Sequence, residues 1–237
     1  MSSLSIILLN YRRVHDTLTC LASLARSTYR DWTVVVVDNA SNDGSVETLR
    51  NQHPQLEILN NDMNLGFAGG NNVGIRRSLA LDARYILLLN NDTVVHAKAL
   101  EELVRTLEEH PEAGIVGGKI LYLDRPDIVW FAGGEFNTRA GFGNHIGIGK
   151  RDDGTYDALR ECDYITGCCL LVRSEVFRSV GLLDDSFFAY LEDVDFCVRA
   201  RGAGYKILYQ PRAVIHHNVS STTSWDSPLY LYFNLRN

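Results

Sequence analysis

Short, continuous apolar runs alternate with helix-patterned segments along the first half of the chain. The runs have the length and β-branched content of buried strands, and they span 4–10, 32–38, 56–60 and 85–90. Helices are expected between and after them, from Asp16 through Ala25, from Ser45 onward, over 72–80 and over 97–110. Because buried strands separated by helices form parallel sheets covered on both faces, this pattern predicts an α/β fold with a mostly parallel, Rossmann-like sheet flanked by helices.

The second half of the chain has a less regular pattern. Residues 123–160 are rich in Gly, Asp and Arg and are expected to form loops or an irregular hairpin. A strand followed by a helix is expected over 165–184, and two short strands over 205–210 and 213–217. The 237 residues suit one domain, 1–237, and the final LYLYFNLRN lacks a helix stop signal, as expected if the natural protein continues beyond it.

Composition narrows the class of protein. An apolar fraction of 46% supplies a sizeable core, and a net charge of −6 without a Lys/Arg block argues against nucleic acid as a partner. The five cysteines form no CxxC pair, which predicts reduced thiols in a cytosolic protein rather than disulfides or a zinc site. The N-terminal apolar run is too short for a signal peptide, and no stretch approaches the roughly 20 apolar residues of a membrane span.

Polar side chains end several of the predicted strands. Asn10 ends the first, Asp38 ends the second, and the run Asn90, Asn91, Asp92 ends the fourth. Each of these residues also suits a turn or a helix cap. In open α/β sheets, however, ligands bind beyond the carboxyl ends of the strands, so the set as a whole predicts a ligand cleft at this edge.

A glycine-rich stretch, NLGFAGGNN (64–72), follows the third strand. It is not the GxGxxG of a dinucleotide fold, and the chain contains no GxxxxGK[ST]. Gly66, Gly69 and Gly70 therefore have two interpretations of equal weight, a tight loop or a close backbone approach to a phosphate.

Taken together, LNY, VDNASNDGS, NLGFAGGNNVG, LLLNNDT, TGCCLLVRSEVFRSVGLLDDSFFAYLEDVDFCVRARGAGY and AVIHHNVSS give the chain a specific resemblance. In their order and spacing it resembles the family-2 glycosyltransferases of GT-A fold, and most closely their rhamnosyltransferase-like branch. The resemblance covers nearly the whole chain. It implies a nucleotide-binding half over 1–110 and a smaller acceptor-binding half over 111–237.

The resemblance implies roles for individual residues. Asp38 matches the residue that accepts a hydrogen bond from the base, and a carboxylate can accept the N3–H of uracil or thymine. Other positions that match the nucleotide pocket are Asn10, Tyr11, Asn72 and Asn91.

A metal site is also implied. Asn90-Asn91-Asp92 matches the DxD metal motif, with Asn90 as a departure, so that Asp92 supplies the one carboxylate. His217 matches the C-terminal histidine that completes the metal site, although His216 leaves the register open by one residue. A nitrogen ligand favours Mn²⁺ somewhat over Mg²⁺.

The acidic run after the apolar FFAYL is implied to be catalytic. Glu192-Asp193 matches the family's ED pair, with Asp193 as general base and Glu192 pointing away or binding an acceptor hydroxyl. A helix is expected to begin near Asp193, and its N-terminal N–H groups are expected to keep that carboxylate ionised. Asp195 is expected to pair with Arg199, four residues on. The aromatic residues of FFAY are expected to wall the acceptor sugar.

The implied activity is inverting transfer from a dTDP- or UDP-sugar, with dTDP-rhamnose as one candidate, to a hydroxyl of a cell-surface polysaccharide or lipid-linked glycan. The implied cofactor is Mn²⁺ or Mg²⁺, and the implied location is the cytoplasm, with peripheral association at the inner membrane face. The alternatives are a sugar nucleotidylyltransferase and a non-catalytic sugar-nucleotide-binding module. The absence of a Gly- and Arg-rich loop after the first strand disfavours the nucleotidylyltransferase.

Overall fold

The computed structural model describes residues 3–137, 142–219 and 228–237. Within these residues, one ten-stranded sheet has the order β10-β12-β6-β11-β4-β1-β2-β3, with β5 paired to β12 and β7 to β6. A separate two-stranded sheet joins β8 and β9. The strands are β1 (Leu4–Asn10), β2 (Trp32–Asp38), β3 (Glu57–Asn60), β4 (Tyr85–Asn90), β5 (Thr93–Val95), β6 (Ala113–Tyr122), β7 (Val129–Phe131), β8 (Gly134–Asn137), β9 (Phe142–His145), β10 (Arg160–Glu161), β11 (Cys169–Arg173) and β12 (Lys206–His217).

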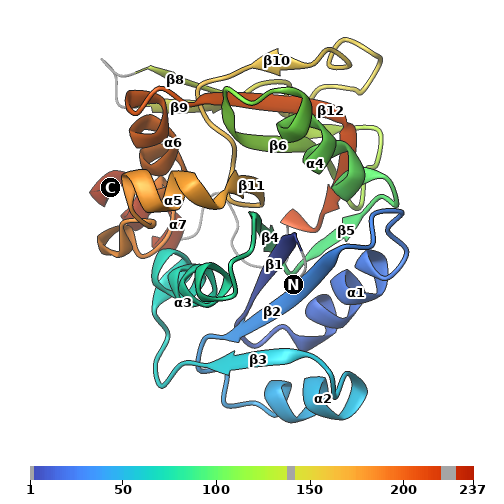
Figure 1. The fold of residues 1–237 in the computed structure, drawn as a ribbon, viewed down its shortest axis with the longest axis vertical. Coiled ribbons are helices and arrows are strands. Elements are labelled where there is room, and N and C mark those ends of the chain that lie inside the picture. Colours follow the sequence, from blue (N-terminus) through green and yellow to red (C-terminus); the bar gives the residue numbers. More distant parts are fainter. Residues whose placement is uncertain (1–2, 138–141, 220–227) are drawn as a thin grey trace.

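Helices cover both faces of the large sheet. They are α1 (Val14–Leu24), α2 (Ser45–Gln52), α3 (Gly66–Ala80), α4 (Ala99–Glu109), α5 (Ser174–Val180), α6 (Glu192–Gly202) and α7 (Pro228–Arg236), with a 3₁₀ turn over Asp185–Phe187. Figure 1 shows α3, α5, α6 and α7 on one side of the sheet and α1 and α4 on the other. None of the helices in these described ranges is long and apolar enough to cross a membrane. The predicted α/β architecture, a sheet flanked by helices, is confirmed. The sheet is mixed: the pairings from β3 through β2 and β1 to β4, and that of β6 with β12, are parallel, and the others are antiparallel.

The N-terminal half follows the predicted pattern closely. Strands β1, β2 and β4 have the predicted bounds and pair in parallel through the centre of the sheet. Their side chains form the most buried part of the core, because this part of the sheet is covered on both faces. Helix α1 begins at Val14, with Arg13 at the N-cap and no side-chain cap, so Asp16 lies in the first turn instead of capping the helix.

The C-terminal half contains strands that the sequence pattern did not reveal. Strand β6 was not predicted, and β11 lies antiparallel between it and β4. The two short strands expected over 205–217 are one strand, β12, with a register shift between Gln210 and Val214. The expected irregular hairpin within 123–160 contains β7, β8 and β9.

Most of the glycine-rich stretch is helical, contrary to the tight-loop interpretation of it. Helix α3 begins at Gly66, so these glycines form its first turns. A methyl group on Gly70 would lie 2.5 Å from Leu9 Cδ1, and one on Gly74 would lie 2.6 Å from Ile7 Cγ2. The glycines therefore allow α3 to pack directly against β1.

Candidate active site

A chain of hydrogen bonds runs along the carboxyl ends of the central strands. Asn10 Nδ2 donates to Asp38 Oδ1 over 2.7 Å, and Asn10 Oδ1 accepts from Thr17 Oγ1 over 2.8 Å. Thr17 Oγ1 in turn accepts from Asn91 Nδ2 over 2.9 Å. Ser41 adds two bonds to Asp38, from its backbone N–H over 2.9 Å and from its hydroxyl over 2.6 Å. Asp38 is thus held in one orientation by its neighbours.

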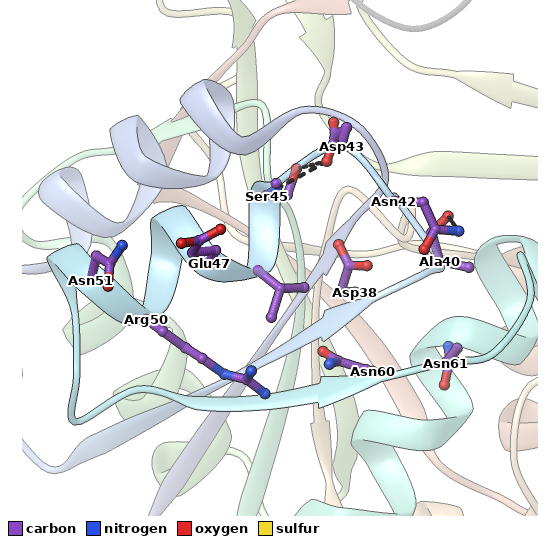
Figure 2. Close-up of a pocket in the computed structure, with 12 residues that line it drawn as sticks. Asp38, Ala40, Asn42, Asp43, Ser45, Glu47, Arg50, Asn51, Asn60 and Asn61 are labelled. Atoms are coloured by element: carbon purple, nitrogen blue, oxygen red, sulfur yellow. Dashed lines mark hydrogen bonds between the residues drawn. The ribbon is translucent and has the colours of Figure 1, made fainter.

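A cavity of about 430 Å³ opens beside Asp38. Figure 2 shows Asp38, Arg50 and Asn60 facing it from β2, α2 and β3. Asp43 and Glu47 also line it, so it carries three carboxylates and one guanidinium. A diphosphate would be repelled by this excess of negative charge, whereas a neutral nucleobase would not. The cavity fits a base more readily than a phosphate.

The other residues predicted for the nucleotide pocket lie elsewhere. The Asn10 side chain is fully buried behind Asp38, and the Asn91 amide is bound to Thr17, so both support the edge of the sheet. Tyr11 is 40% exposed at this edge. The amide of Asn72 is bound to the backbone of Leu183, donating to its carbonyl over 2.8 Å and accepting from its N–H over 3.1 Å. Asn72 thus joins α3 to the segment after α5.

Asp92 and His217 lie side by side, as the resemblance implied. Strand β12 pairs with β5 so that His217 is opposite Thr93, and His217 Nε2 lies 3.1 Å from Asp92 Oδ1. Both side chains are more than nine-tenths buried. His216 is opposite Val94 in the same pairing, so His217 is the histidine beside Asp92.

The donor set of this pair suits a divalent cation that has other ligands. A carboxylate oxygen and an imidazole nitrogen are both accepted by Mn²⁺, and Asn90 Nδ2 lies 3.4 Å from His217 Nε2 at the same place. The described residues contain no cluster of three or more His, Cys, Asp or Glu side chains able to hold a metal. The protein therefore offers two ligands here, and a hard cation would take the remaining oxygens from water or from a diphosphate.

Asp193 lies in the first turn of α6, where two backbone N–H groups hold its carboxylate. Gly167 donates to Oδ2 over 2.7 Å, and Val194 donates to Oδ1 over 2.8 Å. Gly167 is needed for this contact, because a methyl group on it would lie 2.9 Å from the ring of Phe67. Asp193 remains half-buried, whereas Glu192 is 4% exposed and its Oε2 has no hydrogen-bond partner among the described residues.

The expected stabilisation of ionised Asp193 by backbone N–H groups is present, but burial is the larger effect on its pKa. Burial raises its pKa above the ordinary value, although the N–H groups of Gly167 and Val194 oppose that shift. Burial, followed by the charge of Asp193, raises the pKa of Glu192 well above its usual range. Burial therefore disfavours the charged form of both side chains, and more strongly that of Glu192. The expected Asp195–Arg199 pair is confirmed, at 2.7 Å.

The segment before β11 joins Asp193 to the metal-motif region. While the N–H of Gly167 binds Asp193, the carbonyl of the next residue, Cys168, accepts a hydrogen bond from the N–H of Asn90 over 3.0 Å. One dipeptide therefore contacts both the carboxylate of α6 and the end of β4, just before Asp92. The structure brings together the three elements that carry Asp92, Asp193 and His217.

Sequence reasoning missed an aromatic cluster beside these residues. Trp130 meets both His217 and His145 edge to face, with ring centroids 4.7 Å apart in each pair. Burial lowers the pKa of His145 to about 4, so its ring is neutral. Burial and then the charge of Asp193 raise the pKa of Tyr164, which places its hydroxyl in the field of that carboxylate. These rings come from β7, β9 and the approach to β11, where no sequence motif marked them.

One of the FFAY residues, Phe188, packs against the C-terminal helix. The Phe188 ring stacks on Phe233 of α7, with centroids 5.2 Å apart and planes 16° from parallel. That FFAY walls the acceptor sugar stays a prediction, and the rings of Tyr164 and Phe67 also lie near Asp193.

Comparisons with known proteins define the class of this fold and site. The structure superposes on GalNAc-T7 solved with UDP, GalNAc and Mn²⁺, with a TM-score of 0.72 at 13% identity, covering 92% of this chain and 44% of that one. It superposes on a Pyrobaculum calidifontis mannosyltransferase solved with GDP-Man and Mn²⁺, with a TM-score of 0.66 at 17% identity, covering 93% and 58%. These likenesses identify the fold as that of the GT-A glycosyltransferases.

The family follows from the sequence. The model of glycosyl transferase family 2 matches residues 5–181, and the chain belongs to this family of enzymes. The low-salt glycan biosynthesis hexosyltransferase Agl10 of Haloferax volcanii is 29% identical over all of this chain and 74% of its own length. The N-acetylglucosaminyl-diphospho-decaprenol L-rhamnosyltransferase of Mycobacterium tuberculosis is 29% identical over 85% of this chain and 72% of its own. Membership in this family argues against the nucleotidylyltransferase and favours an enzyme over the non-catalytic module.

Proposed function

We propose that this protein is an inverting, metal-dependent glycosyltransferase that moves a sugar from a UDP- or dTDP-sugar to an acceptor hydroxyl. The observation that carries the proposal is the Gly167–Cys168 dipeptide, whose two ends contact Asp193 and Asn90. It brings a carboxylate with a raised pKa to the same region as the buried Asp92–His217 pair. A base and a site for the leaving group are what a direct displacement requires.

Asp193 is proposed as the general base. Each of its oxygens accepts one backbone N–H, which fixes the carboxylate while leaving lone pairs for an acceptor hydroxyl. Its raised pKa makes it a stronger base than an ordinary aspartate. Burial disfavours the charged, nucleophilic form of Glu192, which favours a single displacement with inversion over a covalent intermediate.

The nucleotide is proposed to bind with its base beside Asp38. The pocket is negative, and the remaining lone pair on Asp38 Oδ2 can accept an N–H of uracil, thymine or guanine. Uracil or thymine is favoured by the resemblance to an L-rhamnosyltransferase and by the UDP in a related solved structure, and dTDP-rhamnose is a specific candidate donor. Tyr11 is the exposed side chain best placed to extend this site along the edge of the sheet.

A divalent metal, Mn²⁺ or Mg²⁺, is proposed to be held by Asp92 and His217. When bound, it would supply positive charge to the departing diphosphate. Two of the solved GT-A structures contain Mn²⁺, which supports this assignment. Because both side chains are buried, little water competes with a cation for them.

The acceptor is proposed to be a glycan or lipid-linked glycan presented at the cytoplasmic face of the inner membrane. The name of the mycobacterial relative includes a decaprenol diphosphate, and α7 exposes Leu231, Tyr232 and Leu235. Exposed aliphatic and aromatic side chains on one helix suit a peripheral contact with lipid. Flotation with anionic liposomes tests this, and binding that is unchanged in a Leu231→Ser, Leu235→Ser variant would refute the role of α7.

The proposed function is tested with a panel of nucleotide sugars. Thermal shift in Mn²⁺ identifies the donor, because a ligand at 100 times its Kd stabilises the native state by about 2.7 kcal/mol. Transfer to synthetic acceptors is then followed by mass spectrometry, and the anomeric configuration of the product is read by NMR. Binding without transfer or hydrolysis would leave a binding module, and retained configuration would overturn the inverting mechanism.

A further inference from the structure

The backbone just before Glu192 and Asp193 is strained. Within residues 185–191, here the strained segment, Phe188, Tyr190 and Leu191 have φ of 62°, 68° and 69°. Residues other than glycine rarely occupy this left-handed region, and they do so where surrounding contacts fix the conformation. Leu191 is also the N-cap of α6, so the strained segment sets where that helix begins.

One set of contacts comes from the N-terminus of α3. The carbonyl of Phe188 accepts hydrogen bonds from the N–H groups of Phe67 over 2.6 Å and Ala68 over 3.2 Å. Gly66 has a φ of 71°, and a methyl group on it would lie 2.4 Å from the same carbonyl oxygen. The strained segment and α3 therefore fit together only with glycine at this position.

A second set of contacts comes from the end of α7. The side-chain amide of Asn237 lies within hydrogen-bond distance of three carbonyl oxygens, at 3.1, 2.8 and 2.8 Å from those of Phe187, Ala189 and Tyr190. Arg236 Nη2 adds bonds to the carbonyls of Ser186, over 2.5 Å, and Phe187, over 2.9 Å. Phe233 stacks on Phe188 from the same helix.

Together, α3, α7 and Asn237 just after α7 place donor nitrogens within hydrogen-bond distance of five consecutive carbonyls, those of residues 186–190. A backbone with no regular secondary structure beyond a 3₁₀ turn is thereby fixed from two sides. Without the α7 donors, four of these carbonyls would lose their contacts to that helix, and the left-handed residues would be free to relax. Figure 1 shows the C-terminal end of the chain beside α5, on the same side of the sheet as α6.

We infer that α7 is a positioning element for the transfer reaction, with Arg236 and Asn237 as positioning residues that act through the strained segment on Asp193. The inference rests on the proposed function, because it assigns Asp193 the role of base. Arg236 and Asn237 hold backbone carbonyls and have no part in the proposed donor site. Their loss should therefore lower kcat and leave donor KM unchanged. A misplacement of about 1 Å at a reacting group costs on the order of 10²-fold in rate.

The test uses the whole chain and an Arg236→Ala, Asn237→Ala double variant. The matched control is Arg178→Ala, since Arg178 is a half-exposed arginine of neighbouring α5 that pairs loosely with Asp82. Hydrogen–deuterium exchange of peptides covering 186–195 is expected to accelerate in the double variant and not in the control. In the transfer assay, kcat should fall about 10–10²-fold at unchanged donor KM. Arg236→Lys, which keeps donors at this place, should retain more activity than Arg236→Ala.

Three results would overturn the inference. Unchanged exchange over 186–195 would show that α7 does not hold the strained segment. Faster exchange with normal kcat would show that the contacts are structural and do not position Asp193. If the wild-type protein transfers no sugar, the proposed function fails and the positioning role falls with it, while the exchange measurement still reports on the contact itself. A single Asn237→Ala variant serves if the double variant does not fold, as judged by circular dichroism.

Discussion

Asp193→Asn separates a catalytic role for this residue from a structural one. In the native site, backbone N–H groups approach both carboxylate oxygens, from Gly167 and Val194. An asparagine can accept one of them with its Oδ1, but its NH₂ group would face the other donor. One N–H therefore loses its partner, at a cost of about 1–3 kcal/mol in stability. Removing a carboxylate whose charged form is disfavoured by burial offsets part of this cost.

The effect on rate is expected to be far larger than any effect through folding. A domain with about 5–15 kcal/mol of stability stays overwhelmingly folded after such a loss. The melting temperature should change by about 2–4 °C per kcal/mol. Loss of a general base lowers the rate about 10²–10⁴-fold, which corresponds to about 2.7–5.4 kcal/mol of barrier. If the role of Asp193 were purely structural, Asp193→Asn could lower the rate this much only by unfolding the protein.

The assay compares wild type, Asp193→Asn and Glu192→Gln at saturating donor and Mn²⁺. Released nucleotide and glycosylated product are quantified together, and donor affinity is measured by calorimetry. Asp193→Asn should bind donor normally and transfer sugar at least about 10²-fold more slowly. A near-wild-type Asp193→Asn beside an inactive Glu192→Gln would assign the base to Glu192 instead.

Three further predictions follow from the site. Asp38→Ala should weaken UDP or dTDP binding by about 1–3 kcal/mol, the worth of a hydrogen bond to a charged group, and unchanged affinity in calorimetry would remove its role at the base. Chelation should abolish transfer and added Mn²⁺ or Mg²⁺ should restore it, whereas full activity in chelator would rule out the metal proposed at Asp92 and His217. Glu192→Gln should stabilise the fold above the ordinary glutamate pKa and not below it. This sign follows because the raised pKa of Glu192 means that folding favours its protonated form, so stability is lost as pH rises. Melting curves at pH 4 and pH 8 test this, and an equal shift at both would contradict it.

The central strands could be predicted because their sequences are continuous and β-branched. The bounds of β1, β2 and β4 follow from runs such as WTVVVVD that have no competing interpretation. Strand β6 was missed because Gly117 and Gly118 interrupt its apolar run. Those glycines are required by tertiary contacts, since a methyl group on Gly118 would lie 2.2 Å from the carbonyl oxygen of Ala213. Helix α3 was placed too late for a similar reason, because close packing on β1 outweighs the low helix propensity of its glycines.

Site residues that belong to a local sequence motif could be predicted. Contacts between residues far apart in the sequence could not. Asp92 and His217 match motifs, and β5 and β12 bring them together. The pairing of Asn72 with Leu183 joins residues 111 positions apart, and no local pattern encodes it. The pKa of Asp193 depends on how deeply α6 is buried, which its sequence alone does not determine.

The hydrogen bonds at the N-terminus of α3 bear on how the protein would bind a nucleotide-sugar donor. Many nucleotide-binding folds neutralise phosphate with the free N–H groups of a helix end. Here the backbone N–H groups of Phe67 and Ala68 already donate to the carbonyl of Phe188. The side chains that line the cavity beside Asp38 carry a net negative charge. Under the proposed function, the cation then supplies counter-charge to the diphosphate that these N–H groups do not. Donor and metal would bind as a linked pair, each raising the affinity of the other by the same factor. The rate at limiting nucleotide sugar would consequently follow the free concentration of divalent cation in the cell.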